Sequence, residues 1–147
     1  MKNILVAIDF EEQTDRLLDV VAAYAKAFKA KVWLVHIAAP DPDFIGFDPG
    51  PQYIRDARAE ELREEHRQIQ SYAHRLSEQG IDSDGLLIQG ATIELIIEES
   101  EKLEADLIIT GHHEHNALYK TFFHELAPEI IDNSKVPVLV VPLSEED

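Results

Sequence analysis

Short apolar runs with few polar interruptions are the feature that most constrains this fold. Residues 4–8 read Ile-Leu-Val-Ala-Ile, and further runs occupy 32–37, 86–88, 107–110 and 136–141. A strand that is exposed on one face alternates apolar and polar side chains, whereas a continuous run is typical of a strand buried on both faces of a parallel sheet. The sequence therefore predicts five strands that are covered on both sides.

Segments with helical periodicity separate these runs. Apolar residues recur at helical spacing after Thr14, from Tyr53 to Gln79, after Thr92 and from Phe122 to Ile131. In the first of these helices the residues expected to face inward are Leu17, Val21, Tyr24, Ala25 and Phe28. Strands that alternate with helices predict right-handed crossovers and a parallel sheet between two helical layers. We therefore expect an α/β fold, a single-domain three-layer sandwich over residues 1–147.

The long helix expected at 53–79 carries an apolar stripe, and the segment before it carries none. The stripe consists of Leu62, His66, Ile69, Ala73 and Leu76. The preceding segment, 38–52, contains four prolines and is predicted to be an irregular loop.

Composition excludes several function classes. The chain has 29 acidic and 13 basic residues, a net charge of −16, which argues against binding to nucleic acid or to an anionic membrane surface. It has no cysteine, so disulfides and thiolate chemistry are excluded. No apolar run approaches the roughly 20 residues of a membrane helix, and no signal peptide is recognisable. We expect a cytoplasmic protein.

The segment from Ala105 to Glu125 is the candidate site. A buried strand at 107–110 reaches Gly111 and is followed by His112, His113, Glu114 and His115. In an open parallel sheet, ligands bind beyond the carboxyl ends of the strands, and this segment leaves the sheet there. His36, near the end of the second run, is expected to hydrogen-bond a polar group at the same edge.

Four segments in order resemble the universal stress protein family. They are ILVAIDF at the start, VWLVHI, ADLIITGHH and VPVLVVP, and the resemblance covers the whole chain. It is strongest to the universal stress protein A branch, through GHH and the acidic tail after VVP. The resemblance implies a Rossmann-like fold of the adenine nucleotide alpha hydrolase type, with strand order 3-2-1-4-5. It also implies a stress-response function and a homodimer.

Many members of this family share a phosphate-binding motif, G-x-x-G, nine residues, then G-S or G-T. Its glycines let the backbone approach phosphates, and its free N–H groups bind the anion. Here Gly111 occupies the first position, and Glu114, His124 and Glu125 replace the other three. Two carboxylates beside a triphosphate would repel it by a few kcal/mol each, at about 4 Å and an intermediate dielectric.

Asp9 stands where the family's aspartate contacts the nucleoside, although it also suits the turn that ends a buried strand. The degenerate nucleotide cleft then consists of Asp9, His36, Gly111, His112, His113, His124 and Glu125. The resemblance implies that a member of the A branch does not bind ATP, so we expect no cofactor. An ATP-binding member with weak hydrolysis is the alternative.

The histidines of this segment suggest a second alternative, a transition-metal site. Their spacing disfavours it, because adjacent histidines on extended backbone point apart and no pair stands four residues apart. A patch that titrates near neutral pH is a third reading. We therefore predict no metal site.

The sequence predicts a binding or regulatory protein rather than an enzyme. None of its serines lies in a G-x-S-x-G context, and there is no Walker A motif and no G-x-G-x-x-G after a strand. The last run is an edge strand without charge to protect it, and the resemblance implies pairing with its mate in a dimer. The expected interface is Val138, Leu139, Val140 and Val141. The regulatory protein partner and the stress signal are not encoded in any recognisable motif.

Overall fold

The computed structural model of the chain describes residues 1–8, 14–38, 52–90, 92–112 and 126–143, except the side chains at 54, 92, 112, 126 and 127. Five parallel strands form one sheet in the order β3-β2-β1-β4-β5, as predicted. The strands are β1 (Asn3–Ala7), β2 (Lys31–Ala38), β3 (Ser83–Gln89), β4 (Leu107–His112) and β5 (Val138–Pro142).

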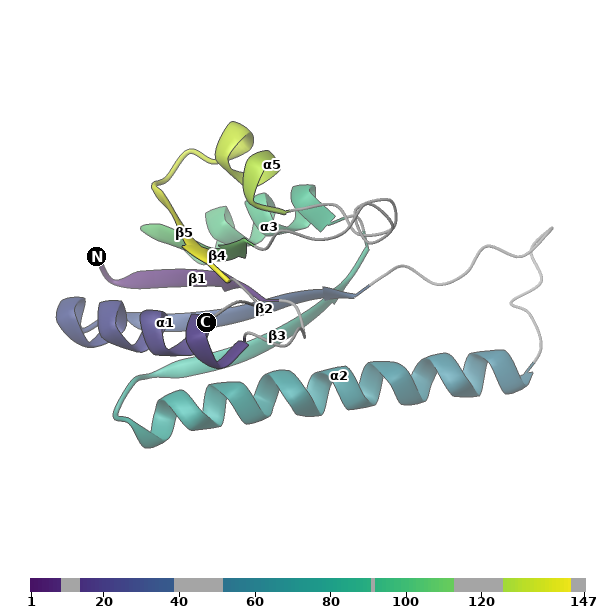
Figure 1. Cartoon of the computed structure of the whole chain (residues 1–147). Coiled ribbons are helices and arrows are strands. Elements are labelled where there is room, and N and C mark those ends of the chain that lie inside the picture. Colours follow the sequence, from purple (N-terminus) through teal and green to yellow (C-terminus); the bar gives the residue numbers. More distant parts are fainter. Residues whose placement is uncertain (9–13, 39–51, 91, 113–125, 144–147) are drawn as a thin grey trace.

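Helices cover both faces of the sheet and complete the predicted three-layer sandwich (Figure 1). On one face lie α1 (Thr14–Phe28) and α2 (Gln52–Glu78), and on the other α3 (Thr92–Lys102) and α5 (Leu126–Asn133). Pro128 occupies the first turn of α5, where its missing N–H costs no helical hydrogen bond. Among the described residues, no helix is both long enough and apolar enough to cross a membrane.

The position of β1 at the centre of the sheet explains why its sequence is continuously apolar. Ile4 and Val6 are fully buried in the core beneath α1 and α2, while Leu5 is fully buried in the core beneath α3 and α5. Successive side chains of a strand point to opposite faces, so both parities must be apolar when both faces are covered. The prediction of a doubly covered parallel strand is therefore confirmed.

Strand β3 is longer than the three residues 86–88 that the sequence indicated. It pairs with β2 from Ser83, opposite Val32, to Gln89, opposite Ala38. Its first residues are polar or glycine, so hydrophobicity alone did not reveal them. Gly85 allows a close approach of the helix above, because a Cβ atom there would lie 2.9 Å from the backbone oxygen of Ile69.

Two residues of α1 do not face inward as expected. Leu17, Val21 and Ala25 are buried, but Tyr24 and Phe28 are 37% and 45% exposed. Their rings stack on each other with centroids 6.5 Å apart. The helical period places Tyr24 at the border of the buried face, where the neighbouring Ala25 takes the inner position.

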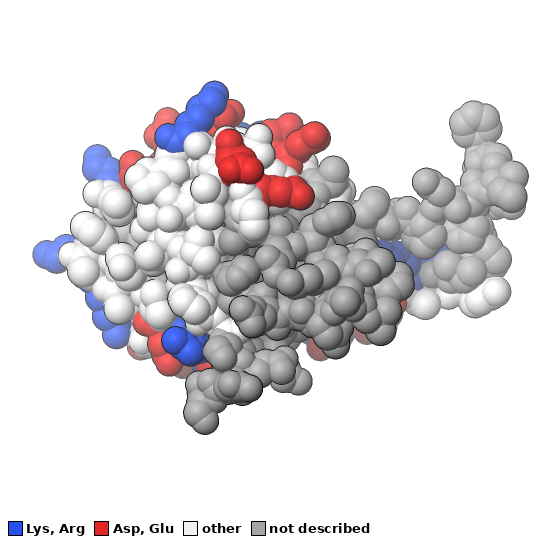
Figure 2. Space-filling model, turned by 45° about the horizontal axis from the view of Figure 1, so that its top comes forward, with Lys and Arg blue, Asp and Glu red and all other residues white. Residues whose placement is uncertain are grey.

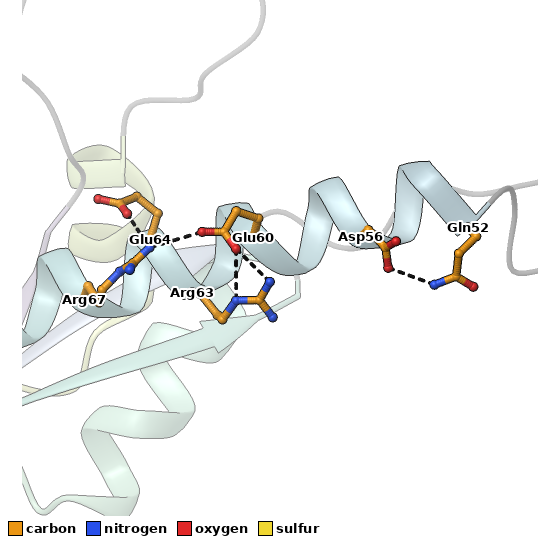
Figure 3. Close-up of polar contacts among 6 residues, drawn as sticks. All are labelled: Gln52, Asp56, Glu60, Arg63, Glu64 and Arg67. Atoms are coloured by element: carbon orange, nitrogen blue, oxygen red, sulfur yellow. Dashed lines mark hydrogen bonds and ion pairs between the residues drawn. The ribbon is translucent and has the colours of Figure 1, made fainter.

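The amino-terminal part of α2 extends beyond the carboxyl ends of the strands (Figure 1). Figure 3 shows the side chains that this part presents to solvent: Glu60 binds Arg63 at 2.7 Å and Arg67 at 3.2 Å, and Arg67 also binds Glu64 at 2.6 Å. The hydrogen bond from Arg63 holds the pKa of Glu60 below its usual range. Exposed pairs of this kind support the helix only weakly.

His66 is exposed rather than partly buried, which corrects the sequence-based assignment of the α2 stripe. Ile69, Ala73 and Leu76 are buried as predicted, and Leu62 is half-buried. At the level of His66 the residue turned toward the sheet is Glu65, which is half-buried beside His36. The stripe deviates because the inner position one turn before Ile69 is taken by Glu65, four residues away, and not by His66, three residues away.

Asp106, just before β4, forms hydrogen bonds with the start of β1. One of its carboxylate oxygens accepts hydrogen bonds from the backbone N–H groups of Lys2 at 2.7 Å and Asn3 at 3.0 Å. Its own N–H donates to the carbonyl of Asn3 at 2.8 Å. The hydrogen bonds from Lys2 and Asn3 lower the pKa of the Asp106 carboxyl, since they stabilise its ionised form.

We expect Asp106→Asn to reduce the free energy of unfolding at pH 7 and to have little effect in acid. A carboxyl group whose pKa is lowered by folding stabilises the fold above its unfolded pKa, near 4, and loses that contribution as pH falls through the folded value. Urea unfolding of the wild type and the variant from about pH 7 to pH 2 measures the difference. Asp19→Asn, at an exposed position of α1, is the control. A difference between wild type and Asp106→Asn that is independent of pH would contradict this explanation.

Candidate functional site

The carboxyl ends of β1, β2 and β4 meet at one edge of the sheet (Figure 1). The chain proceeds from β1 to β2 and β3 on one side, then returns to place β4 on the other side of β1. This reversal between β1 and β4 is the topological switch point at which open α/β sheets bind ligands. Ile8 directly follows β1, His36 lies two residues before the end of β2, and Gly111 is the penultimate residue of β4.

His36 ties the end of β2 to the residue that follows β1. Its Nδ1 lies 2.9 Å from the carbonyl oxygen of Ile8, and the backbone N–H of Ile8 donates to Val35 at the same distance. A carbonyl oxygen only accepts hydrogen bonds, so Nδ1 carries a proton. The prediction that His36 satisfies a polar group at this edge is confirmed.

The second ring nitrogen of His36 faces a carboxylate from α2. Nε2 lies 3.8 Å from Oε2 of Glu65, and the side chains are only 12% and 28% exposed. This contact is an ion pair only when both ring nitrogens carry a proton and the imidazole is positively charged. Oε2 of Glu65 is buried and has no hydrogen-bond partner within the described part of the chain. A carboxylate oxygen without a hydrogen-bond partner among the described residues thus lies beside His36.

Gly111 has a packing role that the sequence did not reveal. A Cβ atom added to this residue would meet a terminal methyl carbon of Leu143, and Leu17 of α1 lies 3.9 Å away. Leu143 is 5% exposed and belongs to the core beneath α1 and α2. A side chain at position 111 would have to displace that of Leu143, so packing favours glycine here in the absence of any ligand.

The structure tests only part of the predicted cleft. Asp9, His113, His124 and Glu125 lie outside the described residues, as do Glu114 and His115. The backbone of His112 belongs to β4 and pairs with Pro142, but its side chain is not described. The structure therefore brings together His36, Glu65 and Ile8, and separately places Gly111 against Leu143.

The metal hypothesis rests on side chains outside the described ranges, which include those of all four clustered histidines. Within the described ranges, no three histidine, aspartate or glutamate side chains are grouped so that they could hold a metal ion. The described residues thus offer no alternative to the histidine segment for such a site.

The predicted dimer strand lies at the edge of the sheet. Over the described residues, β5 pairs with β4 alone. Val138, Leu139 and Val140 are half-buried, and Val141 is 4% exposed because it packs into the core beneath α1 and α2. The free edge is short and apolar.

Sequence reasoning missed two residues that shape this region, Glu65 and Leu143. Glu65 stands four residues before the buried Ile69, so helical periodicity could have placed it on the inner face of α2. Leu143 follows Pro142 immediately before the acidic tail, and no periodic pattern marks it as buried.

Comparison with known proteins decides the family. The model of the universal stress protein family matches residues 1–142. The chain belongs to the universal stress protein family. It is 30% identical to universal stress protein C of Escherichia coli, over 97% of this chain and 96% of that protein. It is also 30% identical to a universal stress protein of Thermus aquaticus, over 95% and 98% of the two chains. A universal stress protein A homolog of Pasteurella multocida is 26% identical, over 99% of each chain.

Solved structures of the family share the fold. Hypothetical protein MJ0577 superposes with a TM-score of 0.73 at 21% identity, over 96% of this chain and 95% of that one. A universal stress protein in complex with cAMP gives 0.66 at 20% identity, over 97% and 98%. A family protein of Arabidopsis thaliana with AMP bound gives 0.68 at 12% identity, over 99% and 94%. Universal stress proteins of this fold therefore include binders of adenine nucleotides.

We expect Gly111→Ala to destabilise the protein in the absence of ligand, by about 1–3 kcal/mol, because the added methyl group displaces Leu143. Combining it with Leu143→Ala should cost less than the sum of the two single changes, since the smaller side chain makes room. Denaturant unfolding of the four proteins in this cycle measures the coupling. Additive effects would show that Gly111 is not held by packing.

Proposed function

We propose that this universal stress protein is of the A type, and that it acts as a homodimer through contacts with a regulatory protein rather than through catalysis. The relatives named universal stress protein A and C support this assignment. The absence of a recognisable nucleophile or Walker motif supports a role without turnover. A cytoplasmic location forms part of the proposal, as does the lack of nucleic-acid and membrane partners, which the acidic charge disfavours.

The observation that carries the proposal is the contact between Gly111 and Leu143. Gly111 is the one position of the phosphate motif that this chain retains, and packing against Leu143 accounts for it. The other three positions hold Glu114, His124 and Glu125, which present charge and bulk to a phosphate group. We infer that ATP is not a resident cofactor.

Adenine nucleotide binding is the second candidate, and the structures solved with cAMP and AMP favour it. A nucleoside monophosphate carries less charge than ATP and would suffer less repulsion from the acidic side chains. Under this alternative, His36 contacts Ile8, the residue before Asp9, which the family resemblance assigns to the nucleoside. Weak ATP hydrolysis belongs to the same alternative.

We expect the purified protein to release no stoichiometric nucleotide, because the motif that holds the phosphates has been replaced. Denaturation followed by chromatography measures bound ATP, AMP and cAMP, and calorimetric titration measures affinity. The triple variant Glu114→Gly, His124→Gly, Glu125→Ser should bind ATP more tightly than the wild type. About one ATP per wild-type chain would refute the proposal, whereas AMP alone at that level would establish the second candidate.

A dimer through β5 is proposed from its free edge. An exposed apolar strand with unpaired N–H and C=O groups is a surface that proteins cover, and pairing with a second copy covers it. Since Ile108 of β4 donates its N–H to Pro137, alternate residues of the last strand, Leu139 and Val141, direct their backbone groups toward β4. The backbone groups of Val138 and Val140 then point to the free edge and would bind the mate.

We expect Val140→Lys to convert the dimer to a monomer, because lysine on an edge strand opposes strand pairing. Analytical ultracentrifugation measures the mass of each species. Tyr53→Lys, at a residue of α2 that is 73% exposed, introduces the same charge far from β5 and should remain dimeric. A wild type that sediments as a monomer, or a dimer that survives Val140→Lys, would rule out this interface.

A metal site formed by the histidine segment is the weakest candidate, since the sequence supplies ligand types without ligand spacing. Elemental analysis of protein purified without a histidine tag tests it directly. Stoichiometric zinc, nickel or copper would establish such a site.

A further inference from the structure

A lysine-lined pocket lies at the amino-terminal ends of the strands, opposite to the candidate cleft at their carboxyl-terminal ends. Its volume is about 430 Å³, and it is formed where α1 ends, β1 and β2 begin and α2 turns into β3. All of these junctions lie on one side of the molecule, on the left in Figure 1. The lining residues are Lys2, Ala25, Lys26, Lys29, Ala30, Lys31, Gly80, Ile81 and Asp82.

The pocket concentrates positive charge in a strongly acidic protein. Four of the 13 basic residues line it, against a single carboxylate, while the chain as a whole carries a net charge of −16. Figure 2 shows several basic side chains projecting from the left edge, where Figure 1 places the end of α1. Like charges repel, so such a concentration is unfavourable unless acidic groups or a bound anion offset it.

Lys31 is held in place by its neighbours. Its Nζ atom lies 2.8 Å from a carboxylate oxygen of Asp84, 3.9 Å from one of Asp82 and 4.1 Å from the ring centre of Trp33. The hydrogen bond with Asp84 raises the pKa of Lys31, so the side chain remains protonated at neutral pH. Asp84 and Asp82 offset the charge of Lys31, so the uncompensated positive charge of the pocket comes from its other lysines.

The other lysines are less neutralised. Lys26 bonds only a neutral group among the described residues, the amide oxygen of Gln79 at 3.2 Å. Lys29 forms no ion pair within the described part of the chain, and it takes the left-handed conformation, with φ of 55°, that usually falls to glycine after a helix. A glycine would relieve that strain, so the lysine is not explained by the local backbone.

Stabilisation of a helix end explains only half of the cluster. Positive charges at the carboxyl end of α1 interact favourably with its dipole, which accounts for Lys26 and Lys29. Lys2 and Lys31 belong to the starts of β1 and β2, where no such dipole exists. Two strands and a helix thus bring their lysines to the same cavity.

We propose that this pocket binds a small anion that carries two or more phosphate groups. Its volume lies within the range of small-molecule sites, roughly 300–1,000 Å³. Ammonium groups are point charges that bind phosphate oxygens without requiring a fixed fork geometry, and several of them can share one polyphosphate. A concave cavity of this size favours a compact ligand over an acidic protein segment, which would need a longer groove.

Inorganic tripolyphosphate is a suitable probe, because it carries the proposed charge and lacks a nucleoside for the opposite edge of the sheet. Trp33 is the only tryptophan of the chain and lies against Lys31, so its fluorescence should report binding. Calorimetry at constant low ionic strength gives the affinity independently. We expect saturable binding by both methods.

The test compares two double variants with the same change in charge. Lys26→Gln with Lys29→Gln removes two pocket lysines and should weaken tripolyphosphate binding at least about tenfold, since each lost contact involves a charged group. Lys102→Gln with Lys135→Gln is the control, because these lysines pair with Glu99 and Glu101 and do not line the pocket. The control should bind within about twofold of the wild type.

Three results would overturn the proposal: no saturable binding in the millimolar range, equal weakening in both double variants, or binding of an oligoglutamate peptide but not of tripolyphosphate. The last would assign the surface to an acidic protein segment. Unfolding curves check that each variant is folded, and Lys29→Gln alone serves as a milder variant. The probe has no nucleoside, and the two double variants differ only in whether pocket lysines are changed. The outcome therefore does not depend on whether the opposite cleft accepts nucleotides.

Discussion

Burial of the central strand on both faces is the constraint on which the rest of the structure depends. Ile4 and Val6 point into one core and Leu5 into the other, and all three are inaccessible to solvent. Fully burying an aliphatic side chain contributes about 1.5–3 kcal/mol, so a strand of this kind is stable only between two helical layers. The two layers and the parallel crossovers then place every carboxyl strand end at one edge of the sheet and every amino end at the other.

The carboxyl-terminal and amino-terminal ends of the strands present different charged groups. At the carboxyl-terminal ends of the strands, His36 forms a hydrogen bond with the carbonyl oxygen of Ile8, and Glu65 of α2 contributes a buried carboxylate oxygen. At the amino edge, lysines from α1, β1 and β2 surround a cavity. Water and salt screen interactions between exposed charges beyond roughly 10 Å, so the two environments can coexist in one small domain. Solved structures of this fold include proteins in complex with cAMP and with AMP, and in this chain the lysine-lined pocket lies at the amino-terminal ends of the strands.

The prediction from sequence was most accurate where a residue's environment is set by regular periodicity. The strands at 4–8, 32–37 and 107–110 follow from runs in which every position is apolar, and the burial of Ile69 and Leu76 follows from the helical period of 3.6 residues. It was least accurate at the borders of the buried helix faces and at the polar start of β3. His66 and Tyr24 were misassigned because they lie beside the inner face, next to the half-buried Glu65 and the buried Ala25, and the start of β3 was overlooked because it is not hydrophobic.

The sequence by itself determined the α/β class, the strand order implied by its family and the loss of three positions of the phosphate motif, because these depend on residue type and spacing along the chain. Only the tertiary structure decided that Leu143 packs against Gly111, that Glu65 faces His36, and that Lys2, Lys26, Lys29 and Lys31 share one cavity. Such contacts join residues from different elements, and no periodic pattern records which side chains will meet when the layers close. The chemistry of both edges is therefore a product of packing between elements.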